Sequence, residues 1–261
     1  MSVSGKNDPV VRQIAVTDIV EALGSGLRDF QKAPLYGLVF GALYAAGGLA
    51  IVLSVVSLGM SYLAYPLAAG FALIGPFVAV GLYDVSRRRE AGLPVSFAQV
   101  LRTVFAQGRR ELAWMAFVTL FIFIMWMYQV RFLMALFLGL SASFSSVQQF
   151  LTVVLTTSEG LMFLLIGNII GAVLALILFS VTVVSFPLLL ERDVDFVTAM
   201  ITSVRAVAKS PLPMIGWAAA VVGLLAIASL PFFLGLLLVL PILGHTTWHL
   251  YRRIVEPVST A

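Results

Sequence analysis

The sequence predicts an all-α fold, a six-span transmembrane helical bundle made of three repeats of an amphipathic interfacial helix plus a transmembrane hairpin. Hydrophobic residues form 61% of the 261 residues and charged residues only 11%, and the mean hydropathy is +1.06. A soluble domain carries about 25% charged residues, so we expect most of this surface to face lipid. We interpret 1–261 as a single integral membrane domain with a flexible N-terminus and three repeats, namely 1–16, 17–84, 95–191 and 194–253.

Three residues suited to cap the N-terminus of a helix mark the repeats: Asp18, Ser96 and Asp195. An oxygen in such a side chain accepts a hydrogen bond from a free backbone N–H of the first helical turn. Apolar residues follow each cap at the same three offsets, a basic residue comes next, and a long apolar stretch then begins within a few residues. Three such starts in register indicate an internal repeat.

Six apolar segments have about the ~20 residues that a helix needs to cross a ~30 Å hydrocarbon layer. Their approximate ranges are 34–56, 60–83, 112–130, 161–190, 212–230 and 231–251. The last two are nearly continuous, and one helix over both would be roughly 60 Å long at ~1.5 Å per residue, so the chain must fold back. Because proline breaks a helix, Pro231 is the expected point of reversal.

Two kinds of segment connect the predicted spans. The residues after each cap form apolar stripes, such as Ile19, Leu23 and Leu27, and a stripe of this kind suits a helix embedded at the headgroup boundary. A cytoplasmic connector packed on the bundle would show the same pattern, and the two interpretations are not exclusive. The stretch 131–160 turns polar and then apolar again. We interpret it as an extracytoplasmic excursion containing a helix on the outer surface.

Basic residues lie almost entirely on one side of the predicted bundle. Of the 16 Lys and Arg, all except Arg131 fall before the first span, between spans two and three, between spans four and five, or after span six. Cytoplasmic loops carry such an excess, so we expect both termini in the cytoplasm. Acids such as Asp29, Asp84 and Glu90 are interleaved with these bases, which favours lipid headgroups over nucleic acid as the partner.

Two sets of residues have expected contacts. The basic residues nearest the span ends are expected to contact lipid headgroups: Arg28, Lys32, Arg87, Arg88, Arg89, Arg109, Arg110, Lys209, Arg252 and Arg253. Glycines spaced four apart let helix backbones approach closely in a membrane. The glycines expected to pack helices together are Gly37, Gly41, Gly167 and Gly171.

The two histidines of the chain, His245 and His249, lie four residues apart near the C-terminus. Positions i and i+4 share one face of a helix, so both could meet one metal ion, or one of them haem. A metal site needs further ligands, and since the chain has no cysteine, Asp84 or Glu191 would have to supply them. We favour the alternative, a structural or partner-contact role beside Trp248 with hydrogen bonds to backbone or to a neighbouring span, and therefore expect no metal and no cofactor.

No enzyme motif is present. The sequence has no glycine-rich phosphate loop, no His-Glu-x-x-His pattern and no suitable Ser–His–Asp set. The predicted spans are almost free of ionisable residues, which a proton or ion pathway normally needs. Gly75-Pro76 and Pro187 can kink spans two and four, and such kinks occur in transporters and in inert bundles alike. We therefore expect no catalytic residues.

Three runs of the chain resemble a known family: 75–92 (GPFVAVGLYDVSRRREAG), 186–200 (FPLLLERDVDFVTAM) and 243–252 (LGHTTWHLYR). They are similar to bacterial predicted integral membrane proteins of unknown function, frequent in alphaproteobacteria, some of which carry a cytochrome c oxidase subunit label. The resemblance covers nearly the whole chain and implies no established activity. A haem–copper catalytic subunit needs many more spans with histidines inside them, so this chain is not that subunit.

These observations predict a non-enzymatic polytopic inner-membrane protein. We expect it to act as an accessory, assembly or scaffold component of a larger respiratory or photosynthetic membrane complex, in contact with membrane lipids and a membrane-protein partner. The alternative is a small-solute or lipid transporter in which the kinked spans two and four form a gate. Stoichiometric association with a larger complex would favour the first function, and a solitary protein with a solvated cavity would favour the second.

Overall fold

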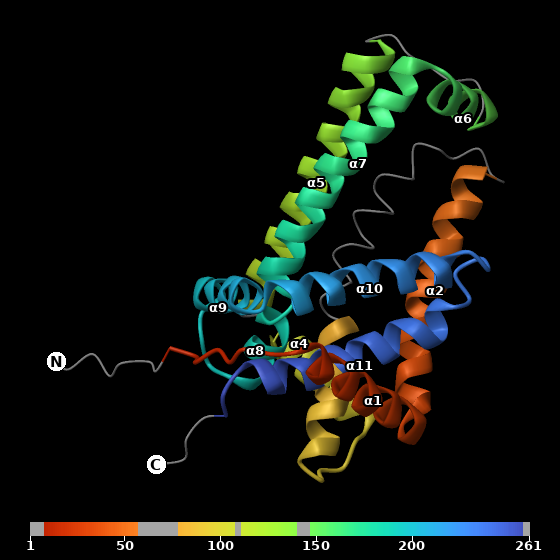
Figure 1. The fold of residues 1–261 in the computed structure, drawn as a ribbon. Helices are drawn as coiled ribbons and strands as arrows, with labels where there is room; N and C mark the ends of the chain where they lie inside the picture. Colours follow the sequence, from red (N-terminus) through yellow and green to blue (C-terminus); the bar gives the residue numbers. More distant parts are fainter. Residues whose placement is uncertain (1–7, 57–77, 108–110, 140–146, 258–261) are drawn as a thin grey trace. The chain divides into compact units, whose positions relative to one another are not determined.

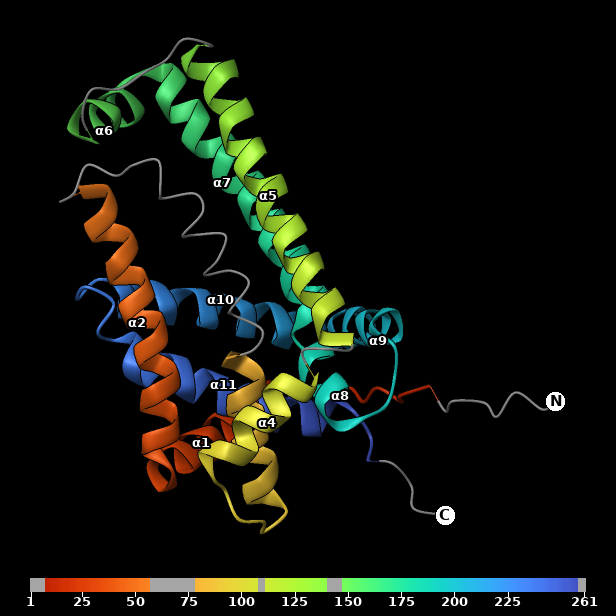
Figure 2. The ribbon, with the colours of Figure 1, turned by 180° about the vertical axis from the view of Figure 1, so that it is seen from behind.

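The structure, a computed structural model, describes residues 8–56, 78–107, 111–139 and 147–257 (Figures 1 and 2). These residues are helical almost throughout, which confirms the all-α prediction. Residues 78–90 form one helix. The other helices are α1 (Val16–Lys32), α2 (Pro34–Val56), α4 (Phe97–Gln107), α5 (Glu111–Leu138), α6 (Val147–Thr156), α7 (Ser158–Thr182), α8 (Ser185–Glu191), α9 (Phe196–Lys209), α10 (Pro211–Ser229) and α11 (Leu236–Ile254).

Four helical segments of the described chain are long and apolar enough to cross a membrane: Pro34–Ser54, Glu111–Leu138, Ser158–Glu191 and Pro211–Ser229. They correspond to predicted spans one, three, four and five. Most of predicted span two, 60–83, lies outside the described residues. The sixth predicted span, 231–251, overlaps α11, which is not among the four because its second half carries histidine, threonine and arginine. The six-span, three-repeat architecture therefore stays a prediction.

The chain divides into two compact units. The first comprises Met1–Phe117 and Phe179–Ala261, and the second comprises Val118–Leu178. The second unit contains α6 and most of α5 and α7, with a core that includes Leu133, Val154 and Phe163. We call this second unit the hairpin unit. A helix does occur within 131–160, as expected, but α5 first continues through Arg131 to Leu138.

Two of the three amphipathic helices begin at the side-chain cap that the sequence predicts. The Ser96 hydroxyl accepts from the Gln99 N–H (3.3 Å) ahead of α4, and the Asp195 carboxylate accepts from the Thr198 N–H (2.9 Å) ahead of α9. The prediction for Asp18 is wrong by three residues. Helix α1 begins earlier, after Ala15, and Asp18 lies in its first turn, where the carboxylate accepts from the Ala15 N–H (2.8 Å). The Asp18 side chain thus accepts a hydrogen bond from the backbone N–H of the N-cap residue, although Asp18 itself lies within the helix.

The two ends of the chain meet in the first unit. Val11 and Val255 form an isolated antiparallel bridge, and the Arg12 N–H donates to the Ile254 carbonyl (2.6 Å). The Ile14 N–H donates to the Ser210 hydroxyl (2.9 Å) at the start of α10. Residues 10–14, which belong to the predicted flexible N-terminus of 1–16, thus contact the C-terminal segment and the start of α10, and the sequence pattern does not reveal these contacts.

Glycines let α2 and α11 approach at backbone distance. A Cβ atom on Gly37 would lie 2.9 Å from Pro241 Cβ, and one on Gly41 would lie 2.9 Å from Leu237 Cα. Gly167 and Gly171, in α7, face side chains at 3.8 and 3.9 Å, which is ordinary contact. The expected close packing thus holds at the first glycine pair and not at the second. The expected reversal near Pro231 is present, because residues 230–235 form turns between α10 and α11.

Candidate functional site

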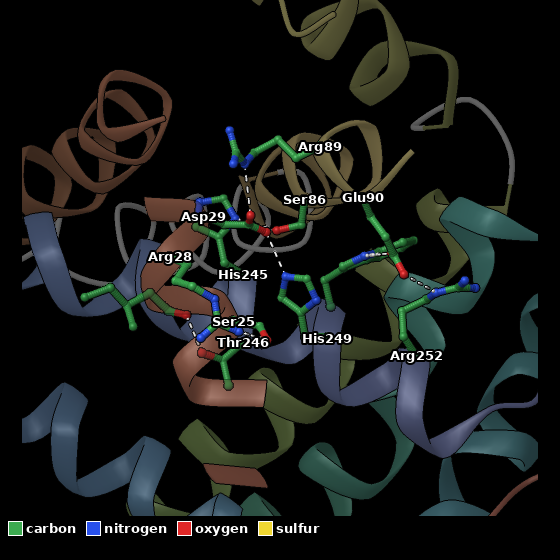
Figure 3. A network of polar contacts seen from close by, with 12 residues as sticks. Ser25, Arg28, Asp29, Ser86, Arg89, Glu90, His245, Thr246, His249 and Arg252 are labelled. Carbon is green, nitrogen blue, oxygen red and sulfur yellow. Dashed lines mark hydrogen bonds and ion pairs between the residues drawn. The ribbon is translucent and has the colours of Figure 1, made fainter. Parts of the chain in front are cut away.

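The two histidines lie in a buried polar cluster between α1, residues 78–90 and α11 (Figure 3). His245 has no exposed surface, and its Nδ1 lies 2.8 Å from the Ser86 hydroxyl. His249, one turn further along α11, places Nε2 2.7 Å from an Asp29 carboxylate oxygen. Arg89 donates from Nε to the other Asp29 oxygen (2.9 Å). We call Asp29, Ser86, Arg89, His245 and His249 the Asp29 cluster.

Asp29 holds its charge at the centre of this cluster. Burial raises the pKa of the carboxyl group, but hydrogen bonds from His249, Arg89 and Ser86 outweigh burial and lower that pKa to about 2. The carboxylate is therefore ionised throughout the neutral range. The carboxylate neutralises Arg89 and orients His249. It therefore joins α1 to the helix of residues 78–90 and to α11.

Close helix contacts bring these residues together. A Cβ on Gly26 would lie 2.6 Å from the Thr246 backbone nitrogen, so only glycine lets α1 pack directly on α11 at this point. A Cβ on Gly244 would lie 2.6 Å from Leu82 Cδ1, and glycine there admits the helix of residues 78–90. Asp29 lies about one turn after Gly26, and Ser86 about one turn after Leu82. The polar cluster thus lies beside two close helix contacts that depend on glycine.

A second set of ion pairs lies beside it on α11, and we call it the Arg252 cluster. Arg252 donates to Glu90 (3.1 Å) and to Glu191 (2.6 Å), and the indole N–H of the buried Trp248 donates to Glu90 (3.0 Å). The hydroxyl of Tyr251 also donates to Glu191. Since Glu191 ends α8, these bonds tie α8 to residues 78–90 and to α11.

The basic residues predicted to contact headgroups divide into three groups. Five of them make intramolecular ion pairs: Arg87 and Arg88 with Asp84 (2.5 and 2.8 Å), Arg89 with Asp29, Arg252 with two glutamates, and Arg253 with Asp18 and Glu21 (3.1 and 2.8 Å). Three are exposed: Arg28, Lys32 and Lys209. Of these, Lys209 donates to the Val11 carbonyl (2.7 Å) and Arg28 to Ser25 (2.9 Å). Arg109 and Arg110 lie outside the described residues.

The arrangement fastens helices of the first unit together. In the described part of the chain, no group of three or more His, Cys, Asp or Glu side chains could hold a metal ion. A cavity of about 150 Å³ adjoins Glu191 and is lined by Glu111 and residues 189–194. Ser86 and His245 are both completely buried, so this serine–histidine pair has no access to a substrate.

Sequence reasoning singles out the two histidines but not their partners. It expects hydrogen bonds to backbone or to a neighbouring span, and the structure has His245 bonded to Ser86 and His249 to Asp29, on two other helices. Their structural role stays a prediction. From the sequence, Asp29 and Glu90 are only acids interleaved with bases, and nothing in the pattern indicates a role for Ser86. The sequence does contain one signal for these partners: a few isolated acids in residues 16–32 and a run of three arginines at 87–89, which could form ion pairs with those acids.

Comparison with known proteins yields one family. Residues 64–191 match the family described as "Predicted integral membrane protein (DUF2189)". The match agrees with the resemblance seen in the sequence, and it includes Ser86, Arg89 and Glu90 of the two clusters. No curated protein and no solved structure matches the chain.

Proposed function

We propose, from the membership of residues 64–191 in a family of predicted integral membrane proteins of unknown function, that this chain is a non-enzymatic polytopic protein of the bacterial inner membrane. It acts as an accessory, assembly or scaffold component of a larger membrane complex, and both of its termini are cytoplasmic. The observation that carries this proposal is the pair of ion-pair clusters. They use buried and half-buried polar residues to fasten helices of the first unit to one another.

Contacts that bracket the apolar helices support three hairpins. The Asp29–Arg89 ion pair joins residues on either side of α2, so if α2 crosses the membrane, the chain must return before residue 89. The Phe196 N–H donates to the Glu111 carboxylate (2.9 Å), and this bond brackets α5 and α7 in the same way. Residues before α10 and after α11 both contact residues 10–14. In each case residues before and after a pair of apolar segments are in contact. These three contacts support six membrane crossings with all the ion-paired segments on one side.

The amphipathic helices leave apolar side chains exposed at that side. Leu101 and Phe105 of α4 are 44% and 70% exposed, and Val197 and Ile201 of α9 are each 46% exposed. Helices of this kind embed apolar residues in the headgroup region or pack on a partner. The proposal therefore includes membrane lipids and a membrane-protein partner as the neighbours of these helices.

Purification from native membranes tests this function. An affinity-tagged chain, extracted in mild detergent and separated by native electrophoresis, is expected to migrate in stoichiometric association with a larger complex. A matched Phe105→Ser variant keeps the ion-pair clusters and is expected to weaken that association. A solitary wild-type chain that leaves the respiratory and photosynthetic complexes unchanged when its gene is deleted would contradict the proposal.

One observation favours transport as a second function. The apolar segment Ser158–Glu191 is interrupted at residues 183–184, between α7 and α8, just ahead of Pro187. Interrupted spans line the substrate sites of many transporters. Small-solute or lipid flux into proteoliposomes that contain the purified chain alone would establish this alternative, and the accessory role predicts no flux above empty vesicles.

A further inference from the structure

Two amphipathic helices of the first unit, α1 and α9, turn apolar side chains outward. Val20 and Leu27 of α1 are exposed, and so are Val197 and Val204 of α9. The buried faces of both helices consist mainly of small or polar residues, namely Ala22, Gly26 and Asp29 in α1 and Ala199, Thr202, Ser203, Ala206 and Val207 in α9. A surface helix of a soluble protein does the reverse, with its apolar stripe facing the core. Both helices therefore need an apolar neighbour on their outer face.

Both helices end at the same kind of bend, directly before an apolar helix. After α1, Ala33 has φ −137° and ψ 51°, and Pro34 then begins α2. After α9, Ser210 has φ −136° and ψ 61°, and Pro211 then begins α10. Since α2 and α10 contain two of the four segments long and apolar enough to cross a membrane, one residue separates each amphipathic helix from a candidate span. This connection brings the end of each helix to the membrane surface, and it does not depend on the hairpin unit.

An exposed arginine and an exposed lysine, four residues apart, precede each bend: Arg28 and Lys32 in α1, Arg205 and Lys209 in α9. Among the described residues, only Arg205 of these four forms an ion pair, with Asp8 at 3.5 Å, and both side chains of that pair are more than half exposed. An exposed pair of this kind contributes about 1 kcal/mol or less. Four bases with little internal compensation thus lie in the last turns before two candidate spans.

Charge determines which neighbour suits these two faces. The hairpin unit and the apolar stretch 57–77 together contain one acid, Glu159, so neither offers carboxylates for four bases. A second copy of the chain carries a formal net charge of +4. A lipid leaflet has phosphates at the depth where a span begins and acyl chains directly beneath them. It therefore supplies both a counter-charge and an apolar layer, and it does so at both helices.

We propose that α1 and α9 lie in the headgroup layer of the leaflet at which α2 and α10 begin, and that they bind anionic phospholipid there. The exposed valine and leucine side chains reach the upper part of the acyl chains, and the Arg-x-x-x-Lys pairs bind phosphate oxygens. This inference rests on one part of the proposed function, the insertion of α2 and α10 in the membrane. It deepens that function by naming lipid as the neighbour of α1 and α9, which leaves the exposed face of α4 for a protein partner.

Spin labelling measures the depth of the two faces, because the chain contains no cysteine of its own. Full-length Leu27→Cys and Val204→Cys are labelled and reconstituted in vesicles of phosphatidylcholine and phosphatidylglycerol in equal parts. Both labels should collide more often with oxygen than with a water-soluble nickel chelate. The matched control is Glu21→Cys, on the side of α1 that pairs with Arg253 and 63% exposed, where the nickel chelate should dominate.

Two results of this experiment would overturn the proposal. Labels at positions 27 and 204 that are as accessible to the nickel chelate as the control label would place both faces in water. Labels shielded from both reagents would show that protein, not lipid, covers these faces.

The bases are tested in the Leu27→Cys background with a fluorophore attached at that position. Brominated phosphatidylglycerol should quench it more strongly than brominated phosphatidylcholine. Arg28→Gln combined with Lys32→Gln should lower this preference about fivefold for each base removed, equivalent to about 1 kcal/mol per base. Arg12→Gln removes an exposed base before α1 and should leave the preference unchanged.

Equal quenching by the two lipids, or an unchanged preference in the double variant, would refute the role of the bases. Neither readout depends on whether a larger complex co-purifies with the chain. Failure of this inference is therefore distinguishable from failure of the accessory role.

Discussion

Replacing Asp29 by alanine should destabilise the first unit severely. The side chains of Asp29, Arg89 and His249 are only 12%, 23% and 19% exposed. Removing the carboxylate leaves the guanidinium buried without its counter-charge, and breaking a buried pair in this way costs about 3–5 kcal/mol. The matched control is Glu21→Ala, whose side chain is 63% exposed in its pair with Arg253. That exposed pair contributes less than about 1 kcal/mol.

Acid titration provides an independent measure of the same carboxylate. Its pKa is 3.8 in an unfolded chain and about 2 in the folded protein, so the carboxylate stabilises the fold above pH 3.8. That stabilisation is lost as the pH falls towards 2. A difference of this size corresponds to about 2 kcal/mol at 1.36 kcal/mol per pH unit. Asp29→Asn should be less stable than wild type at neutral pH and should lack this part of the acid-dependent loss.

The assay is denaturant unfolding in mild detergent, followed by circular dichroism and by tryptophan fluorescence. Trp248, one of four tryptophans in the chain, donates its indole N–H to Glu90 beside the Asp29 cluster, so its share of the emission reports on this region. The reasoning is refuted if Asp29→Ala costs no more than Glu21→Ala. It is also refuted if Asp29→Asn loses as much stability as wild type between pH 4 and pH 2.

Three further predictions concern packing, topology and capping. Gly41→Ala should destabilise the protein by about 1–3 kcal/mol because the new methyl would meet the backbone of α11, whereas Gly223→Ala, with open space around it, should be neutral or stabilising in the same unfolding assay. Reporter fusions at Ala261 and Ser145 should fall on opposite sides of the membrane, and reporters on the same side would eliminate the six-span prediction. Asp195→Ala should cost about 1 kcal/mol through the lost bond to the first turn of α9, and hydrogen exchange localised to that turn checks it.

Features determined by neighbours in the sequence could be predicted. Ser96 and Asp195 cap helices because each oxygen reaches an N–H three residues away, and the apolar spans follow from composition and length. Asp18 was misplaced because a carboxylate can satisfy a helix start from the cap or from inside the first turn. Sequence pattern alone does not distinguish the two positions.

The candidate site could be predicted only in part, because its partners are far apart in the chain. Arg89 and Asp29 are separated by 60 residues, and Arg252 and Glu191 by 61. Arginines at span ends favour headgroups by sequence rules, but an acid on a neighbouring helix competes for them. Only the folded arrangement decides which contact forms. For the same reason the tie between residues 10–14 and the C-terminal segment was missed.

The pairing of Val11 with Val255 sets an order of events during synthesis. Arg12 and its partner Glu256 are 244 residues apart, and a ribosome adding about 5–20 residues per second needs roughly 10–50 s to make the intervening chain. Throughout that time the N-terminal segment lacks the residues with which it pairs. The apolar helices can enter the membrane one after another, whereas Val11 can pair with Val255 only after α11 has been made.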